Sequence, residues 1–311
     1  MTIKTCVIGC GSVASGVDSP DTEHVLSHGK AINAHPKFSL SACYDLVTES
    51  ANEFQKKWGA EKVHLSIDEV FEAPYDLYVI CSSTDSHYEL LDQALESNCK
   101  GIICEKPLVS NLDELCRIED KVLGTDKKIL VNFTRRFDKA HQELAEYLED
   151  QPLGPLLQFN AHVSKGIVHN GSHLVDMLLW FFGGISSLDQ ISGSKKGDDL
   201  IGCFRLVLEN GIEGIIQVVE DLDYSLFDLD LIYKEGRASL RNIGYDISVY
   251  KGQPSSIYQG YNDLVLSKQF EASLDKAFYN LYETYAENKY SQSALKQAMI
   301  ASKLLYTLAD K

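Results

Sequence analysis

Two histidines and an aspartate recur at the spacing of a helix face in GIVHNGSHLVD, residues 166–176. His169, His173 and Asp176 stand at positions i, i+4 and i+7. On an α-helix these three side chains would point to one side. Histidines four residues apart can ligate zinc, and a neutral imidazole can accept a proton near neutral pH. The segment therefore allows three interpretations: a metal site, a proton-transfer site, or a helix end whose histidines form only local hydrogen bonds.

The residues between the two histidines argue against a metal site. Gly171 would cost about 1 kcal/mol in a helix interior, and the segment has no glutamate to act as a general base. Ser172 is the predicted N-cap of a helix that begins at His173, which leaves His169 in the preceding loop. We therefore expect no metal. We expect His173 to act as a base, because a helix N-terminus disfavours the imidazolium cation. For His169 local hydrogen bonding is an equal alternative, and we expect Asp176 to complement the helix end.

A second segment with chemical meaning lies near the start of the chain. Residues 9–14, GCGSVA, match the pattern GxGxx(G/A) and follow an apolar run at 4–10. The first glycine allows a tight turn, the second lets backbone approach a pyrophosphate, and the third position must be small. Backbone N–H groups at the start of the next helix can face the phosphates. The predicted cofactor-binding residues here are Gly9, Gly11, Ser12, Val13 and Ala14.

Asp45 ends the second predicted strand and is the candidate to bond the adenosine ribose. A carboxylate repels a 2′-phosphate and no arginine adjoins it, so Asp45 favours NAD while leaving NADP open. Asp45 lies further from the glycines than the usual ~20 residues. We attribute the excess to an insertion at residues 17–28. The alternative interpretation of Asp45 is a solvated residue at a strand end.

Strand-like and helix-like segments alternate over the first part of the chain. Nearly continuous apolar strands between helices predict a parallel sheet covered on both faces, that is, a doubly wound Rossmann domain. Asn111, with Glu114 three residues later, is the predicted cap of the helix from 111 to 123. The other expected elements are strands at 4–10, 38–45, 61–65, 76–83, 100–107 and 127–133 and helices at 48–59 and 85–98.

The pattern changes after about residue 150. Asn210–Gly211 and Glu235–Gly236 are turn signals inside two predicted hairpins, 203–221 and 227–242, and residues 246–251 are another expected strand. Consecutive hairpins predict an antiparallel sheet. Helices at 270–288 and 292–309 are expected to close the chain. We predict an α/β protein with a Rossmann domain at 1–125 and an α+β domain at 126–311, packed together with the active site between them. The last helix is a candidate to pack on the first domain.

Composition narrows the function classes. The net charge is −16, whereas nucleic acid requires clustered lysine and arginine. No apolar run approaches the ~20 residues of a membrane helix. Eight cysteines without a CxxC pair are typical of a reducing compartment. The first residues are typical of a strand, not of a signal peptide. We expect a cytoplasmic protein that binds neither nucleic acid nor membrane.

Four segments occur in an order that is specific as a set. They are Glu105-Lys106-Pro107, SSTDSH at 82–87, NFTRRFD at 132–138 and GSHLVDMLLWFFGG at 171–184. With the glycine turn before them, they resemble the glucose–fructose oxidoreductase/inositol dehydrogenase/MocA family over nearly the whole chain. The resemblance implies an open, mostly antiparallel sheet in the second domain. It also implies NAD(P)-dependent oxidation or reduction of a sugar, cyclitol or similar polyol, in a homodimer or homotetramer formed through that sheet.

The resemblance also implies roles for particular residues. Lys106 and His173 are expected beside the reacting carbon, with His169 in place of an aspartate found in many members. His173 would take the hydroxyl proton while Lys106 stabilises the alkoxide, or Lys106 would transfer the proton itself. The insertion and the RRFD segment look more like members from surface-polysaccharide and nucleotide-sugar pathways. Further cofactor-binding candidates are Ser82, Thr84, His87, Glu105 and Lys106.

Several basic and polar residues are candidates to bind substrate. Arg135 and Arg136 would grip a phosphate or carboxylate, with interdomain ion pairing as an equal alternative. His162, Lys165 and Asn170 are further candidates to line the substrate pocket, together with Lys106, His169 and His173. Two other functions stay open at this point. One is a non-catalytic dinucleotide-binding sensor, which the presence of Lys106 and His173 disfavours. The other is a reductase of a non-sugar carbonyl.

Overall fold

The computed structural model describes residues 2–16, 18–197 and 199–310, so residue 17 of the predicted insertion lies outside the described part. The chain divides into two compact units. Unit 1 comprises Met1–Phe137 and Leu274–Ser302, and unit 2 comprises Asp138–Ser273 and Lys303–Lys311. Each unit is described by itself. The domain boundary after residue 125 stays a prediction.

Unit 1 is built on a six-stranded sheet in the order β3-β2-β1-β4-β5-β6, with every pairing parallel. The predicted Rossmann fold is thereby confirmed. Strands β1, β4 and β5 are almost entirely buried because helices cover the sheet. The strands are β1 Ile3–Ile8, β2 Phe38–Tyr44, β3 Lys62–Val63, β4 Leu77–Ile80, β5 Gly101–Cys104 and β6 Lys128–Val131.

The helices of unit 1 begin and end at the residues that favour such ends. Asn111 Oδ1 accepts a hydrogen bond from Glu114 N at 2.9 Å, as predicted for the cap of α6. Gly59 ends α3 in the left-handed conformation. The elements are α1 Ser12–Ser15, α2 His28–Ala34, α3 Thr48–Trp58, α4 Ile67–Glu72, η1 Thr84–Ser86, α5 His87–Glu96, α6 Leu112–Gly124, η2 Thr134–Phe137, η5 Leu274–Lys276, α9 Ala277–Ala286 and α10 Gln292–Ala309. Helix α10 continues beyond Ser302 into unit 2.

Unit 2 contains an eight-stranded sheet in the order β14-β13-β12-β11-β7-β10-β9-β8. Strands β7 and β10 pair in parallel, and the other neighbours are antiparallel, which confirms the predicted second sheet. The strands are β7 Leu156–Ser164, β8 Ile185–Lys196, β9 Asp199–Leu208, β10 Glu213–Val219, β11 Phe227–Tyr233, β12 Gly236–Arg241, β13 Asp246–Pro254 and β14 Asn262–Glu271. The remaining elements are α7 Lys139–Glu149, η3 Gly166–Asn170, α8 Gly171–Phe182 and η4 Asn242–Gly244.

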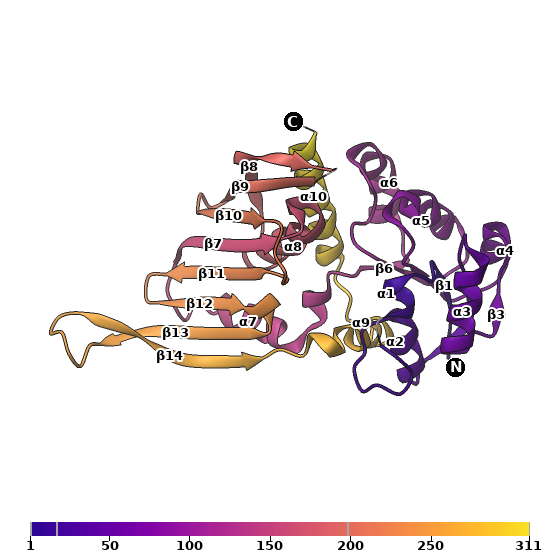
Figure 1. The fold of residues 1–311 in the computed structure, drawn as a ribbon, viewed down its shortest axis with the longest axis horizontal. Coiled ribbons are helices and arrows are strands. Elements are labelled where there is room, and N and C mark those ends of the chain that lie inside the picture. Colours follow the sequence, from indigo (N-terminus) through magenta and orange to yellow (C-terminus); the bar gives the residue numbers. More distant parts are fainter. Residues whose placement is uncertain (1, 17, 198, 311) are drawn as a thin grey trace. The chain divides into compact units, whose positions relative to one another are not determined.

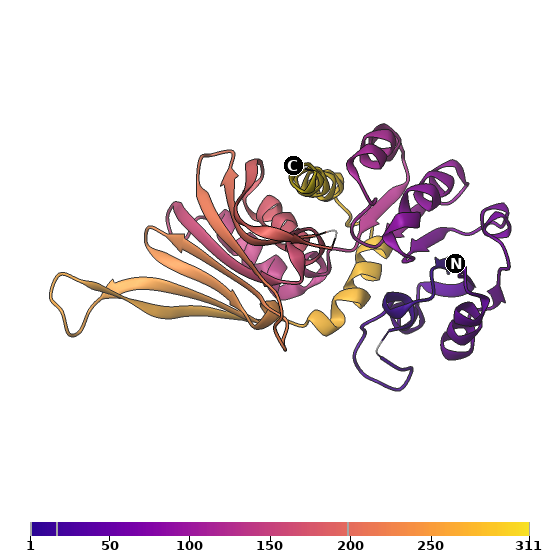
Figure 2. The same ribbon diagram turned by 45° about the horizontal axis from the view of Figure 1, so that its top comes forward.

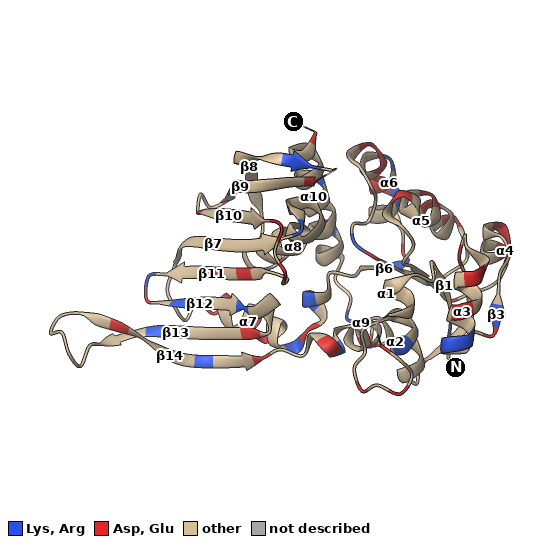
Figure 3. Ribbon diagram, viewed as in Figure 1, with Lys and Arg blue, Asp and Glu red and all other residues tan. Residues whose placement is uncertain are grey.

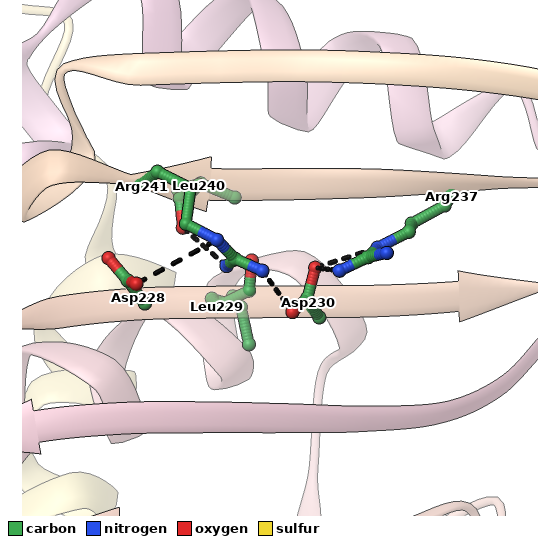
Figure 4. A network of polar contacts seen from close by, with 6 residues as sticks. All are labelled: Asp228, Leu229, Asp230, Arg237, Leu240 and Arg241. Carbon is green, nitrogen blue, oxygen red and sulfur yellow. Dashed lines mark hydrogen bonds and ion pairs between the residues drawn. The ribbon is translucent and has the colours of Figure 1, made fainter. Parts of the chain in front are cut away.

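The two faces of this sheet differ. Helices α7 and α8 pack on one face (Figures 1 and 2), and alternate residues of β11 such as Leu229 and Leu231 are fully buried. The opposite face carries polar side chains. There Asp230 Oδ1 accepts from Arg237 Nε at 2.8 Å, and its other oxygen accepts from Arg241 (Figure 4). Strand alternation therefore separates an apolar core face from a charged open face.

The predicted helix from 270 to 288 is wrong in its first part. Residues 262–271 form β14, paired with β13 from Asp246 opposite Glu271 to Pro254 opposite Asn262. Helix α9 begins only at Ala277. Backbone pairing with β13 decides the conformation of residues 270–271, and tertiary context of this kind overrides local preference. Residues 274–276 form the short helix η5.

The helices of the described residues are rich in acidic side chains in unit 1, and none has the character of a membrane span. Acidic residues mark the helices of unit 1, α4 and α6 among them (Figure 3). Within the described ranges, no helix combines the length and apolar character that a bilayer crossing requires.

Candidate functional site

The glycine turn after β1 has the geometry that close backbone approach requires. Gly9 has φ of +92°, and a Cβ there would lie 2.4 Å from Ser82 N. A side chain at Gly9 would therefore clash with the end of β4. By contrast, no described atom beyond its chain neighbours lies within 4 Å of a Cβ built on Gly11. The space beside Gly11 is open to a ligand, and Ala14 is fully buried under the turn.

Asp45 connects the end of β2 to this turn. Its Oδ2 accepts a hydrogen bond from Cys10 N at 2.6 Å, and its Oδ1 accepts one from Val47 N at 2.8 Å. The carboxylate is partly exposed. Because both oxygens accept from backbone N–H groups, the position of Asp45 is set without a ligand.

A cavity of about 500 Å³ opens at the carboxyl ends of β1, β2 and β4. Leu46 and Val47, which follow Asp45, line it although they are 89% and 53% exposed. Sequence reasoning missed them, although two apolar residues directly after the strand-end aspartate were a usable signal. The lining residues are Ile8, Gly9, Gly11, Tyr44, Asp45, Leu46, Val47, Ile67, Cys81, Ser82, Ser83, Ser86, Glu89, Leu90 and Gln93.

This cavity fits the adenosine half of a dinucleotide. It combines a carboxylate for ribose hydroxyls, apolar side chains for a base and an open glycine turn for phosphate. A wider cavity of about 940 Å³ lies at the amino ends of β1, β4, β5 and β6, beside Lys4 and Lys128. Ligands of parallel sheets bind at the carboxyl ends of strands, so the smaller cavity is the candidate cofactor site.

Glu105, directly after β5, lies in a buried polar network. Its Oε1 lies 3.0 Å from His28 Nε2 and accepts from Asn132 Nδ2 at 2.6 Å. His28 Nδ1 lies 2.9 Å from the Tyr282 hydroxyl. Burial raises the pKa of Glu105, but the hydrogen bonds that it accepts from His28 and Asn132 outweigh burial, and the net pKa lies below its ordinary value. Glu105 is therefore ionised at neutral pH.

Sequence reasoning missed three members of this network. Asn132 begins the NFTRRFD segment and could have been singled out there. His28 gave no signal because it lies 77 residues before Glu105. Tyr282 gave none because it lies 254 residues after His28.

The loop after β4 holds the other residues expected at the cofactor. Ser82 lines the cavity and Thr84 begins η1. His87 is 1% exposed, with Nδ1 2.8 Å from Pro107 O and Nε2 3.2 Å from Ser82 O. Neither Thr84 nor His87 is among the described residues that line the cavity. His87 thus connects the loop after β4 to the loop that carries Lys106.

In unit 2 the structure places Lys165, His169, Asn170 and His173 on one connection, β7–η3–α8. Asp199 holds this connection, since its two carboxylate oxygens accept from Val168 N and His169 N, both at 2.8 Å. The described residues contain no group of three or more His, Cys, Asp or Glu arranged to hold a metal ion.

The predicted cap at Ser172 is wrong. Helix α8 begins at Gly171, and the helical turn η3 directly precedes it, so His169 lies in a helical turn and not in a loop. The Ser172 hydroxyl donates to His169 O at 2.8 Å. Bonding to a carbonyl three residues back is an option that serine has inside a helix, and it replaces the capping bond. Asp176 is buried in α8, 2% exposed.

Of the remaining substrate candidates, one lies on β7 in unit 2 and two lie in unit 1. His162 is opposite Asp228 in the register of β7 and β11, on the open face of the sheet. In unit 1, Arg136 Nη2 donates to Gln297 Oε1 at 2.9 Å, and Arg135 is buried in η2. Arg136 is therefore engaged with α10 in this structure.

The fold and the glycine-turn cavity of unit 1 are those of a dinucleotide-binding Rossmann domain. Residues 3–133 match the model of the glucose–fructose oxidoreductase/inositol dehydrogenase/MocA family, described as an oxidoreductase family with an NAD-binding Rossmann fold. This match over residues 3–133 confirms the resemblance drawn from the motifs of the chain.

Two relatives illustrate the sequence similarity. An uncharacterized oxidoreductase of Schizosaccharomyces pombe is 26% identical over 229 residues, 66% of this chain and 59% of that protein. Myo-inositol 2-dehydrogenase of Thermotoga maritima is 33% identical over 116 residues, 37% of this chain and 34% of that protein. The chain thus spans about a third to three fifths of the length of these relatives.

Two solved structures share the whole fold. Levoglucosan dehydrogenase in complex with NADH has a TM-score of 0.81 and 16% identity, covering 100% of this chain and 97% of its own. A 3-ketoreductase from Actinomadura kijaniata, in complex with NADP and TDP-benzene, has a TM-score of 0.77 and 15% identity, covering 100% and 98%. At this identity the likeness concerns the fold.

Proposed function

We propose that this protein is an NAD-dependent oxidoreductase that transfers hydride between the cofactor and a hydroxyl-bearing carbon of a sugar or nucleotide sugar. The observation that carries the proposal is the cavity at the carboxyl ends of β1, β2 and β4, where Asp45 lies against the open glycine turn. The family match over residues 3–133 supports it. The carboxylate of Asp45 favours NAD, because it would repel the 2′-phosphate of NADP.

The names of relatives support a polyhydroxylated substrate. They include inositol 2-dehydrogenase of Rhizobium meliloti and glucose-6-phosphate 3-dehydrogenase of Bacillus subtilis. We propose a sugar or nucleotide sugar, with surface-polysaccharide biosynthesis as the setting and a homodimer or homotetramer as the assembly. The substrate-binding candidates Arg135, Arg136, His162, Lys165, His169 and Asn170 are part of this proposal.

The proton chemistry is assigned to one residue in each unit. When bound, the nicotinamide supplies the hydride acceptor or donor. His173 would take the proton of the substrate hydroxyl as hydride leaves the carbon, and it would return a proton in the reverse direction. The Lys106 ammonium would donate a hydrogen bond to the same oxygen and stabilise its developing negative charge.

A substrate screen tests the function. The purified protein is incubated with NAD and one candidate substrate at a time, drawn from free sugars, cyclitols and nucleotide sugars. The appearance of NADH fluorescence is recorded, and active compounds are tested again with NADP. We expect turnover with at least one polyol or nucleotide sugar and a preference for NAD over NADP. Binding of NADH without turnover of any such compound would contradict the proposed reaction and favour a sensor.

Two substitutions test the assigned proton chemistry. We expect Lys106→Met and His173→Ala each to lower kcat by about 10²- to 10⁴-fold, with NADH affinity little changed because neither side chain is assigned to the adenosine cavity. Steady-state rates and NADH fluorescence titration measure the two quantities. Lys56→Met, at an exposed position of unit 1, is the control. Turnover near the wild-type value in both test variants would remove this mechanism.

A further inference from the structure

The inserted segment of unit 1 is held in place by its own contacts. Asp18 is buried, and its carboxylate accepts from the Ser27 hydroxyl at 2.8 Å and from Leu26 N at 2.7 Å. Val25 N donates to Asp275 O at 2.8 Å, just before α9. Residues 18–28 therefore form a defined structure that joins α2 to the region of α9.

This segment ends at His28, whose ring is fully buried in unit 1. The ring of Phe278 packs edge-on against it, with 5.0 Å between centroids. Its two nitrogens face the Tyr282 hydroxyl and the Glu105 carboxylate. The imidazole thus bridges α9 and the loop that carries Lys106.

The partners of His28 determine the direction of its hydrogen bonds. Ionised Glu105 can only accept, so His28 Nε2 donates to it. Burial raises the pKa of Tyr282 well above its ordinary value, so Tyr282 keeps its hydroxyl proton and can donate to His28 Nδ1. Because the chain of hydrogen bonds ends at a buried phenol, it does not lead protons to solvent. Its effect is to orient Glu105.

Asn132 contributes a second donor to the same carboxylate oxygen. The amide orientation follows from this bond, since the carbonyl of Asn132 would repel Glu105. Its Oδ1 is buried, and no described residue provides it with a hydrogen bond. Two donors from different elements, α2 and the end of β6, therefore converge on Glu105 Oε1.

We infer that His28 is a positioning residue, delivered by the inserted segment, which holds Glu105 and through it the loop from which Lys106 extends. The expected loss of kcat rests on the proposed function, because only that function gives Lys106 a catalytic role. A side chain that must act on a reacting carbon loses about 10²-fold in rate when it is displaced by 1 Å. A loop held by buried donors to a charged carboxylate is a means of preventing such displacement.

The chain offers a matched control in the same unit. His64 is also buried, with Nε2 2.7 Å from the Tyr75 hydroxyl and Nδ1 3.3 Å from Glu69. It forms the same tyrosine–histidine–glutamate sequence of contacts, but after β3 and without contact to the loop at 105–107. Loss of His64 should therefore destabilise the fold in a similar way without releasing that loop.

The experiment compares the full-length variants His28→Leu, His28→Gln and His64→Leu. Hydrogen–deuterium exchange is measured for the peptide spanning 104–111 without ligand, and kcat, KM and the NADH dissociation constant are measured separately. For His28→Leu we expect at least 10-fold faster exchange in this peptide and a 10- to 100-fold lower kcat, with KM changed less than threefold. His28→Gln keeps a donor toward Glu105 and should stay within about threefold of wild type in kcat. His64→Leu should leave both quantities within twofold.

Two outcomes would overturn the inference. One is wild-type exchange in this peptide of His28→Leu, and the other is an equal loss of kcat in His64→Leu. If His28→Leu does not fold, Tyr282→Phe, which removes only the hydroxyl donor, takes its place, with an expected two- to tenfold increase in exchange. Exchange is measured without substrate, so it decides the positioning role independently. Absence of wild-type turnover would count against the proposed function alone.

Discussion

At the scale of single residues, Asp45 is the most informative side chain of unit 1. Its carboxylate is already committed to the backbone N–H groups of Cys10 and Val47. A carboxylate with two charge-assisted donors keeps its orientation. Asp45 therefore shapes the glycine turn and at the same time presents negative charge to the cavity.

Replacement of Asp45 tests both effects. We expect Asp45→Asn to weaken NADH binding by about 10- to 100-fold, since hydrogen bonds to a charged group contribute about 1.5–3 kcal/mol. The preference for NAD over NADP should shrink as well, because the repulsion of a 2′-phosphate is lost. Fluorescence titration with NADH and NADPH measures both. Asp21→Asn, at an exposed position of the inserted segment, should change neither. Unchanged affinity for both cofactors in Asp45→Asn would place the ribose elsewhere.

At the scale of elements, the connection between β7 and α8 depends on one glycine. Gly166 has φ of +80°, and a Cβ there would lie 2.0 Å from Asp199 Oδ2. Asp199 in turn accepts from two backbone N–H groups of η3. The turn that carries His169 and leads to His173 therefore needs both a left-handed residue and the absence of a side chain.

Substitution of Gly166 tests two requirements, the left-handed conformation and the absence of a side chain. Gly211→Ala is the control for the first requirement alone, because Gly211 has φ of +84° with no described atom near its Cβ position. We expect Gly211→Ala to lower the free energy of unfolding by about 1 kcal/mol, from the left-handed conformation alone. Gly166→Ala should lower it by about 2–4 kcal/mol, since overpacking adds about 1–3 kcal/mol. Urea unfolding of both variants measures the difference. Equal losses would mean that Asp199 gives way without cost.

At the scale of the whole molecule, each unit contains a buried carboxylate bound to a histidine. In unit 1 the pair is Glu105 and His28. In unit 2 it is Asp138, which lies 2.6 Å from His141 Nδ1 and accepts from Ser273 N at 2.7 Å. Burial raises the pKa of Asp138, but the hydrogen bond from His141 outweighs it, and the net pKa is lowered.

These lowered pKa values predict acid sensitivity. The unfolded carboxyls titrate near ~4. Because both folded pKa values lie lower, the unfolded chain binds more protons in this range, and stability rises with pH. The contribution is complete above the unfolded pKa and is lost as pH falls through the folded pKa. We expect the free energy of unfolding to decline below about pH 4.

Urea unfolding between pH 3 and pH 7 measures this decline. Glu105→Gln and Asp138→Asn should each be less stable at pH 7 and show a shallower decline, because each lacks one of the two titrating groups. A decline as steep as that of wild type in both variants would assign the acid sensitivity to other carboxyls.

The sequence by itself determined the Rossmann sheet, the cap at Asn111 and the antiparallel sheet with its hairpins. These features depend on short patterns: apolar runs, a capping residue and turn residues such as Asn210–Gly211. The glycine turn and Asp45 were found in the same way, because each lies at the end of a recognisable strand. Patterns among neighbouring residues are sufficient to predict strands, turns and helix caps, because these features depend on contacts between neighbours in the chain.

Only the tertiary structure decided which distant residues meet. His28 reaches Glu105 across 77 residues and Tyr282 across 254, and pairing with β13 places residues 270–271 in strand β14 instead of a helix. Likewise Asp199, 33 residues after Gly166, holds the turn η3. The sequence suggested a loop there, followed by a helix capped at Ser172. Such contacts depend on the path of the whole chain, whereas periodicity and turn chemistry describe only neighbours along it.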